Sequence, residues 1–329
     1  MSNQTMTFSE AFQQGVREEM GRNSDIFVLG TDLFERGGHF AQVKGLGPEF
    51  GQERVRDTPI SEAAMVAAGV GAALYGLHPI VDLNFVDFAL GAMDEITNQA
   101  AKIRFMLGRP VPLLIRATHG IALGGAHHQN SLEAWFMHTP GLAVAIPSTP
   151  ADVKGLVKTA LRAPDPVIFL MHKRLSGQRG EVGGPDDLVP FGQARVARPG
   201  TACTIVTYGG TVGPAIQAAE TLSGKGIDAE VLDLRTLWPI DLDAVVDAAR
   251  RHGRIVVVDE APLVGSATAE IAAQVQQAAF HYLDGPVTRV GAIRAPLGAN
   301  PKLIEAALPS VADIVAAVDG LFDPAQVTA

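Results

Sequence analysis

Apolar positions in the first half of the chain follow two periods, one typical of helices and one typical of buried strands. From Phe8 to Met20 they recur every fourth residue and predict a helix over 7–22, whereas Ile26–Gly30 is a short apolar run typical of a strand. The same patterns predict strands at 79–83, 111–116, 142–146 and 167–170, and helices at 61–75, 88–105 and 150–162. This alternation predicts right-handed βαβ units in a parallel sheet that helices cover on both faces.

The alternation resumes after a stretch of different character. Residues 173–199 are rich in Gly, Pro and charge and lack helical periodicity, so we expect an exposed connection there. Beyond it the pattern predicts strands at 202–208, 229–232, 254–258 and 287–290, and helices at 212–223, 242–251 and 267–279. We therefore predict an α/β protein of two domains, 1–185 and 186–329, each a mostly parallel sheet covered by helices.

Composition narrows the class of protein. The 329 residues are 47% hydrophobic and 19% charged, which excludes disorder and coiled coil. The net charge of −9 argues against a nucleic-acid partner. The single cysteine, Cys203, excludes an internal disulfide and a multi-cysteine metal site. Residues 1–12 lack a signal-peptide pattern, and the charge-free stretch 63–77 is too short for a bilayer, so we expect a cytoplasmic protein without a membrane partner.

Three local features are candidates for a functional site. Pro59 and Ser61 place Glu62 in the first turn of a helix, where the helix dipole favours its charge. An ordinary carboxylate at a helix start is the alternative. The second feature is a glycine-rich loop with adjacent histidines at 127 and 128. These histidines could transfer protons near neutral pH, and the alternative is that both are ordinary surface residues of a loop.

The third feature is an aromatic pair beside Asn84. Phe85 and Phe88 lie three residues apart where a strand gives way to a helix, so they suit either core packing or a face for an aromatic cofactor ring. A zinc site at His127 and His128 is disfavoured because no cysteine lies near. The residues predict no metal site of the chain's own.

Six ordered blocks extend over nearly the whole chain: FGQERVRDTPISEAA (50–64), GAALYGLHPIVDLNF (71–85), MDEITNQAAKIRF (93–105), HHQNSLEAWFMHTPGLAVAIPSTPADVKGL (127–156), DLRTLWPID (233–241) and DEAPLVG (259–265). Together they resemble the β subunit of the thiamine-diphosphate-dependent first component of 2-oxo acid dehydrogenase complexes. The resemblance implies a pyrimidine-binding domain followed by a transketolase C-terminal-type domain. It also implies an α2β2 heterotetramer whose α subunit holds the diphosphate and Mg²⁺, because this chain has no GDG motif with a following Asn pair.

The resemblance also implies roles for individual residues. Glu62 matches the glutamate that hydrogen-bonds N1′ of the aminopyrimidine and promotes its imino form. Phe88 matches the aromatic that stacks on this ring, and Ile60 and Asn84 match positions that line it. His128 matches a histidine near the reacting centre, where it would bind the substrate carboxylate or transfer protons during acyl transfer.

Departures from the family pattern concern the substrate side. The loop reads His128-Gln129-Asn130-Ser131 and is one residue shorter than usual, so His127 is the alternative catalytic histidine. Met171 replaces a usual glutamate. Relatives hold a structural K⁺ on main-chain carbonyls at the position of residues 161–165, which is a further expectation here.

The expected function follows from the resemblance. It is decarboxylation of a 2-oxo acid, or cleavage of an acyloin or diketone, with acyl transfer to a lipoyl-bearing acyltransferase partner. The alternative enzyme is the C-terminal subunit of a split, transketolase-like ketol transferase. A non-catalytic assembly subunit is the alternative from another class.

Overall fold

The chain divides into two units in the computed structural model, which describes residues 4–122 and 124–323. The first unit runs to His119 and resumes at Trp135–Phe191. The second unit comprises Gly120–Ala134 and continues from Gly192. A segment inside the first half of the sequence therefore belongs to the second unit. The domain boundary expected between residues 185 and 186 stays a prediction.

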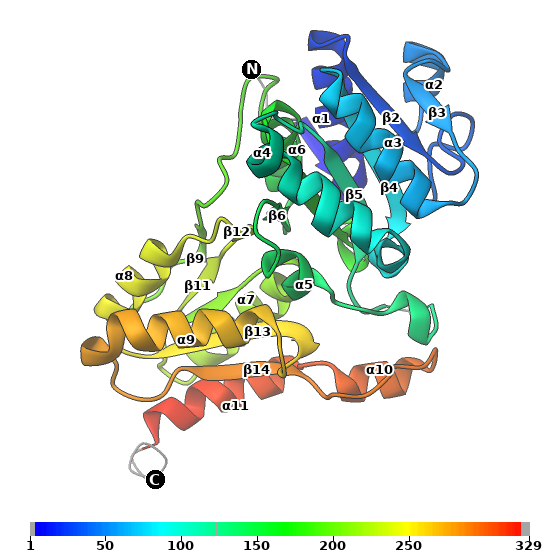
Figure 1. Ribbon diagram of the computed structural model, residues 1–329. Coiled ribbons are helices and arrows are strands. Elements are labelled where there is room, and N and C mark those ends of the chain that lie inside the picture. The colour runs from blue at the N-terminus through cyan, green and yellow to red at the C-terminus, as the bar shows by residue number, and fades with distance from the viewer. Residues whose placement is uncertain (1–3, 123, 324–329) are drawn as a thin grey trace. The chain divides into compact units, whose positions relative to one another are not determined.

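A parallel sheet forms the centre of the first unit, as the alternation predicted (Figure 1). Within this unit the strands lie in the order β6-β7-β5-β4-β2-β3, and each neighbouring pair is parallel. They are β2 (Ile26–Gly30), β3 (Val55–Asp57), β4 (His78–Phe85), β5 (Leu114–His119), β6 (Ala143–Ala145) and β7 (Val167–His172). Because all run the same way, their carboxyl ends meet along one edge, which is where ligands bind in such sheets.

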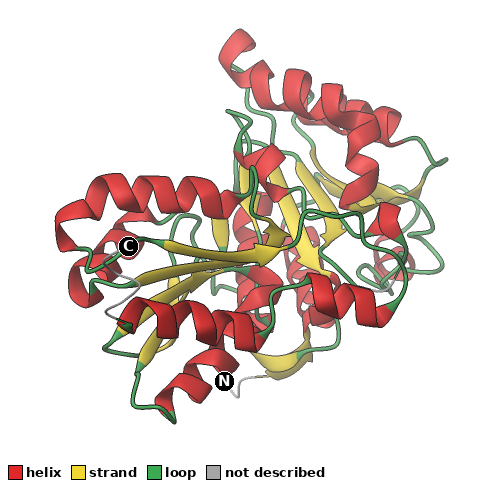
Figure 2. Cartoon of the chain, turned by 90° about the horizontal axis from the view of Figure 1, so that it is seen from below, coloured by secondary structure: helices red, strands yellow, loops and turns green. Residues whose placement is uncertain are grey.

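Helices cover both faces of this sheet (Figure 2). On one face, α1 (Phe8–Arg22) and α6 (Pro150–Arg162) pack together and share an apolar cluster with β2, β4 and β7. On the other, α3 (Glu62–Leu74) packs on β4 and comes so close at Gly69 that a Cβ there would lie 2.6 Å from Val81 Cγ2. The other helical segments of this unit are α2 (Leu46–Phe50), η1 (Val86–Ala92), η2 (Glu95–Ala100), α4 (Ala101–Leu107) and η4 (Lys173–Leu175).

One sequence prediction about helices needs correction. The helix expected over 88–105 is divided into the 3₁₀ segment η1, the π-helical η2 and the α-helix α4. The Thr97 hydroxyl donates to Met93 O at 2.6 Å, an added bond to the helix backbone at the π-helical turn. Ser61 stands at the N-cap position of α3, but its side chain makes no capping hydrogen bond.

The stretch expected to be only an exposed connection contains two strands. β8 (Arg179–Val182) pairs antiparallel with β1 (Gln4–Thr7), and β9 (Arg195–Arg198) joins the sheet of the second unit. Each of these strands is only four residues long, so the alternation of apolar and polar residues does not distinguish it from a charged loop. The first strand and the last strand of the first unit therefore lie side by side.

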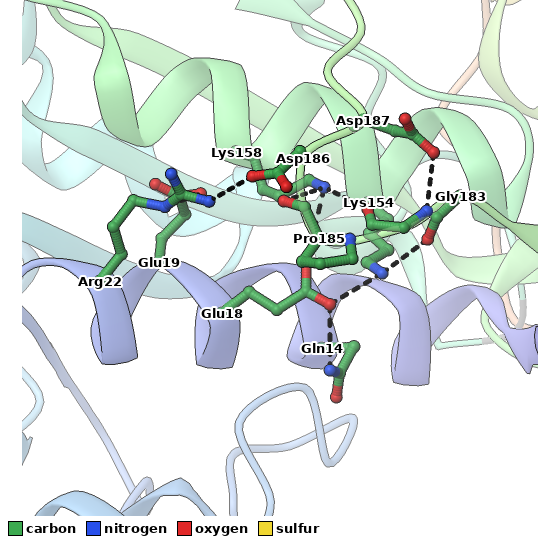
Figure 3. Close-up of polar contacts among 12 residues, drawn as sticks. Gln14, Glu18, Glu19, Arg22, Lys154, Lys158, Gly183, Pro185, Asp186 and Asp187 are labelled. Atoms are coloured by element: carbon green, nitrogen blue, oxygen red, sulfur yellow. Dashed lines mark hydrogen bonds and ion pairs between the residues drawn. The ribbon is translucent and has the colours of Figure 1, made fainter. Parts of the chain in front are cut away.

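A buried lysine cluster, Glu18 with Lys154 and Lys158, fixes the chain that follows β8 (Figure 3). Lys154 Nζ lies 2.8 Å from Glu18 Oε1 and also donates to Gly183 O at 2.8 Å. Lys158 Nζ is 3.6 Å from Glu18 Oε2 and donates to the next two carbonyls, Gly184 O at 2.9 Å and Pro185 O at 3.1 Å. Burial lowers the pKa of Lys158, and Glu18 opposes this shift. The cluster therefore joins α1, α6 and the segment that follows β8.

The second unit is built on its own mostly parallel sheet (Figure 1). Its strand order is β14-β13-β10-β11-β9, in which only the edge strand β9 runs antiparallel to its neighbour. The strands are β10 (Cys203–Thr207), β11 (Ala229–Asp233), β13 (Ile255–Pro262) and β14 (Thr288–Ala292), with β9 as above, and β12 (Thr236–Trp238) is a further short strand. The predicted α/β class with two sheets is thus confirmed.

Helices again cover both faces of the second sheet. α7 (Val212–Ser223) and α11 (Val311–Phe322) share an apolar cluster with alternate residues of β10, β11 and β13. α8 (Leu242–His252) and α9 (Ala267–Ala279) contact each other and the remaining face. The shorter segments are η3 (Ala126–His128), η5 (Gly209–Thr211), η6 (Phe280–Tyr282) and α10 (Pro301–Ala307), and the first two residues of α5 (Glu133–Met137) also belong to this unit. No helix in residues 4–122 and 124–323 has the length and apolar character needed to cross a bilayer.

Candidate active site

Glu62 begins helix α3, shortly after the carboxyl end of β3. It occupies the first helical turn, as predicted, and is half-buried. Its carboxylate forms no hydrogen bond or ion pair with any other residue that the structure describes. Ile60, two residues earlier, has 79% of its surface exposed. A half-buried carboxylate without a partner beside an exposed apolar side chain is an arrangement suited to contact with a ligand or another chain.

Asn84 lies at the carboxyl end of β4 in a left-handed conformation with φ of 58°. Asparagine tolerates this conformation better than most residues. Its N–H donates to Asp82 Oδ1 at 2.8 Å, and the pairing of β4 with β5 is irregular between Asp82 and Phe85. Among the described residues its buried Oδ1 has no hydrogen-bond donor. A ligand N–H would remove the cost of that unsatisfied acceptor.

A buried network below Asn84 holds Asp82 in place. Arg116 forms an ion pair with Asp82 at 3.1 Å, and Gln42 Nε2 donates to Asp82 Oδ2 at 2.7 Å. Arg116 also approaches Met171 Sδ at 3.4 Å. The family resemblance expects a glutamate at position 171, so Arg116 meets a thioether, which is a weak acceptor, in place of a second carboxylate. Met171 is the last residue but one of β7, near the carboxyl end of that strand.

Aromatic side chains gather directly after β4. Phe85 and Phe88 contact edge-to-face with centroids 5.7 Å apart, and Phe40 packs on Phe85 at 5.6 Å. His39 lies 5.3 Å from the Phe85 ring, and Lys173 Nζ lies 5.4 Å from its centroid. The strand-to-helix junction predicted for this pair is confirmed, since β4 ends at Phe85 and η1 begins at the next residue. The choice of Phe88 as the stacking ring stays a prediction.

Two further histidines at this edge were missed by sequence reasoning. His119 and His172 are the last residues of the paired strands β5 and β7, and their rings are perpendicular with centroids 5.2 Å apart. Both are buried, and His172 Nδ1 accepts a hydrogen bond from Arg174 N at 3.2 Å. Each histidine is a polar residue at the end of a largely apolar strand, and this feature of the sequence could have identified both as candidate site residues.

The histidine loop, defined here as residues 120–122 and 124–134, belongs to the second unit. His127 is exposed and His128 is half-buried, and their rings lie 4.2 Å apart. His128 N donates to Gly125 O at 3.1 Å, and Gly125 has φ of 85°, which favours glycine. The structure therefore assigns the two histidines to a different unit from Glu62.

The first unit thus supplies several of the predicted residues along one edge. Asn84, Phe85 and Phe88 come together there, and α3, which begins with Glu62, packs on η1, which contains Phe88. These groups fit an aminopyrimidine ring, because they offer a carboxylate, an amide oxygen and aromatic faces. Within the part of the chain that the structure describes, no three His, Cys, Asp or Glu side chains are grouped to bind a metal ion.

Comparison with known proteins agrees with this architecture. The transketolase pyrimidine-binding domain family matches residues 4–178, and the transketolase C-terminal domain family matches residues 192–314. The pyruvate dehydrogenase E1 component β subunit of Rhizobium meliloti is 43% identical over 318 residues, which cover 95% of this chain and 69% of that protein. The 2-oxoisovalerate dehydrogenase β subunit of Bacillus subtilis is 40% identical, with 94% and 99% covered. This chain belongs to the 2-oxo acid dehydrogenase β-subunit family.

Other relatives show the breadth of this β-subunit family. The β subunit of acetoin:2,6-dichlorophenolindophenol oxidoreductase of Cupriavidus necator is 42% identical, covering 93% of this chain and 94% of that protein. A solved structure named "Split gene transketolase, inactive beta4 tetramer" superposes with a TM-score of 0.77 at 28% identity, covering 95% and 97% of the two chains. Identity to the dehydrogenase β subunits is higher, so the split-transketolase alternative is not favoured.

Proposed function

We propose that this chain is the β subunit of a thiamine-diphosphate-dependent enzyme that decarboxylates a 2-oxo acid, with an active site completed by an α subunit. The observation that carries the proposal is the carboxylate of Glu62, half-buried and without a partner among the described residues, on the helix that packs against the segment of Phe88. The family names support the same reaction class. Acyloin cleavage is a second candidate because the acetoin enzyme's β subunit is equally similar.

The residues of this chain would act on the pyrimidine half of the cofactor. When bound, thiamine diphosphate supplies a nucleophilic carbon and an electron sink for decarboxylation. Glu62 would hold a proton at N1′ of the pyrimidine, Phe88 would contact the ring face, and Asn84 Oδ1 would accept from the exocyclic amino group of the ring. Ile60 would exclude water from the ring.

Histidine would act on the acyl group. In the net reaction the 2-oxo acid loses CO₂ and its acyl group goes to one sulfur of a lipoyl disulfide, while the other sulfur takes a proton. His128 would move protons in this step, with exposed His127 as the alternative. Comparing His128→Ala with His127→Ala in acyl transfer decides between them.

The remaining ligands and partners are also proposals. Mg²⁺ would be held mainly by the α subunit together with the diphosphate, and a lipoyl-bearing acyltransferase would receive the acyl group. A structural K⁺ is proposed at residues 161–165. Two carbonyls of that segment, Leu161 O and Pro164 O, already lie within hydrogen-bond distance of His78 Nδ1 and Val111 N. Calorimetry with thiamine diphosphate and Mg²⁺ should show binding to the co-expressed α and β chains and none to this chain alone.

Glu62→Gln tests the catalytic role in the assembled complex. We expect turnover to fall about 100- to 10,000-fold, because an amide cannot hold a proton as the carboxylate does. Glu270→Gln is the matched control, since Glu270 is also a first-turn carboxylate, on α9. Assembly should persist in both variants. Full activity of Glu62→Gln would favour the non-catalytic assembly subunit.

A further inference from the structure

An acidic cluster, Glu133, Asp259 and Glu260 with Tyr208, is buried in the second unit. All four side chains have at most 3% of their surface exposed. The Tyr208 hydroxyl lies 3.5 Å from Glu133 Oε1, and Glu260 N donates to Asp259 Oδ1 at 2.6 Å. Three carboxyl groups this close cannot all be charged in a medium of low polarity without a large cost. The cluster therefore needs at least one proton.

The proton belongs to the pair Glu133 and Asp259. Burial raises the pKa of the Glu133 carboxyl well above its usual range, and the charges of Asp259 and Glu260 raise it further. Burial also raises the pKa of Asp259 to about 6, partly offset by a hydrogen bond with Tyr208. Protonation of Glu133 lowers the charge repulsion among the three carboxyl groups.

Glu260 ties the histidine loop to strand β13 at two points. Its Oε1 accepts from Ile121 N at 2.9 Å and from Ser131 Oγ at 3.4 Å. These donors flank His127 and His128 in the sequence, six residues before the first and three after the second. One carboxylate oxygen therefore fixes the loop on both sides of its histidines.

Other contacts hold the loop but do not replace Glu260. The Ile121 side chain packs with Leu297 and Ile304, and Gln129 Nε2 donates to Gly298 O at 2.9 Å. Among the described residues of the loop, the regular structure is the three-residue segment η3 and the first two residues of α5. A loop with so little internal structure keeps one conformation only through such anchors, because ordering each residue has an entropic cost.

We propose that Glu260 is a positioning residue that holds the histidine loop in the geometry needed for acyl transfer. The inference rests on the proposed function, in which a histidine of this loop acts on the acyl group. Glu260 acts through the loop and does not itself touch the substrate. An error of about 1 Å in the position of a catalytic group can lower a rate about 100-fold, so loss of the anchor should be visible in this step.

The test uses the complex of this chain with its α subunit and the best substrate among pyruvate, 2-oxoisovalerate and acetoin. Decarboxylation or cleavage is followed with 2,6-dichlorophenolindophenol as electron acceptor, and acyl transfer with lipoamide. Glu260→Met removes the acceptor at similar volume, whereas Glu260→Gln keeps an oxygen for Ile121 N and Ser131. We expect Glu260→Met to lower acyl transfer about 10- to 100-fold with the dye reaction within about threefold, and Glu260→Gln to restore most of the loss.

Hydrogen exchange at the Ile121 amide reports the anchor independently of activity. It should accelerate at least about tenfold in Glu260→Met, because the buried N–H loses its acceptor. Glu230→Met is the matched control: it removes another carboxylate buried in the second unit, which pairs with Arg251 at 3.0 Å. It should lower stability without changing the ratio of the two reactions. If Glu260→Met does not fold, Ser131→Ala should give the same pattern at a smaller, about two- to fivefold, effect.

The outcomes separate this inference from the proposed function. Unchanged exchange at Ile121, unchanged acyl transfer, or an equal fall of both reactions in Glu260→Met would overturn the positioning role. An unsubstituted complex that processes none of the three substrates would contradict the proposed function, while the exchange measurement would still decide whether Glu260 anchors the loop.

Discussion

Each unit of the chain buries a group of like charges, and the two groups are neutralised differently. In the lysine cluster of the first unit, two ammonium groups share Glu18 and direct their other N–H groups at main-chain carbonyls (Figure 3). In the acidic cluster of the second unit, burial raises the pKa of Glu133 and Asp259, and a proton removes charge. In the lysine cluster, main-chain carbonyl dipoles stabilise the excess positive charge at any pH. In the acidic cluster, the charge depends on a bound proton and therefore on pH.

The largest effect is expected for Glu18→Gln. This change leaves Lys154 and Lys158 buried without a carboxylate, so the free energy of unfolding of the first unit should fall by about 3 kcal/mol. Urea unfolding with Trp238→Phe as background isolates Trp135, which lies in the first unit. Glu49→Gln is the control, because Glu49 forms a surface ion pair with Arg17, which lies on α1 as Glu18 does. This substitution should change the free energy of unfolding by about 0.5 kcal/mol or less. Similar losses in both variants would contradict the comparison.

A smaller effect is expected from pH. A carboxyl group whose pKa is raised on folding stabilises the folded state fully below its unfolded pKa of about 4, and this stabilisation is lost as pH rises through the folded value. For Asp259 that value is about 6, so the second unit should lose stability between about pH 4 and pH 6. Asp259→Asn should flatten this slope when unfolding is followed by Trp238 in a Trp135→Phe background. An unaltered slope would show that Asp259 does not titrate there.

The smallest effect is expected for Glu133→Gln at neutral pH. A protonated carboxyl and an amide are both neutral and similar in size, so stability should change by about 0.5 kcal/mol or less. The Glu→Gln substitution should therefore destabilise the protein at Glu18, whose carboxylate must be charged, and have little effect at Glu133, whose carboxyl group must be neutral. A loss at Glu133 as large as that at Glu18 would mean that Glu133 is ionised at neutral pH.

Local patterns predicted most of the fold because they depend on neighbours in sequence. Strand β2 and helices α6, α7 and α9 have the predicted bounds. The helix expected over 88–105 could not be resolved into its segments, since apolar spacing does not distinguish a π-turn from an α-turn. Strand β8 was missed because its partner β1 is far away in sequence. The family membership and the two-domain class are confirmed.

The candidate site was predictable to a lesser degree. Glu62, Asn84 and Phe88 occupy the predicted element junctions, and their roles toward the cofactor stay predictions. The role of Glu260 could not be predicted from the sequence, because its hydrogen-bond partners Ile121 and Ser131 lie more than a hundred residues away along the chain. Sequence spacing cannot report a contact of that range.

The pairing of β1 with β8 has a consequence for synthesis on the ribosome. Helix α6 and the two lysines that contact α1 are synthesised about 130 residues after α1. Strand β8, which pairs with β1, begins only at residue 179. At about 5–20 residues per second, α1 remains without α6 for roughly 7–27 s and β1 remains without β8 for roughly 9–35 s. During that interval the apolar side of α1 cannot be buried against α6.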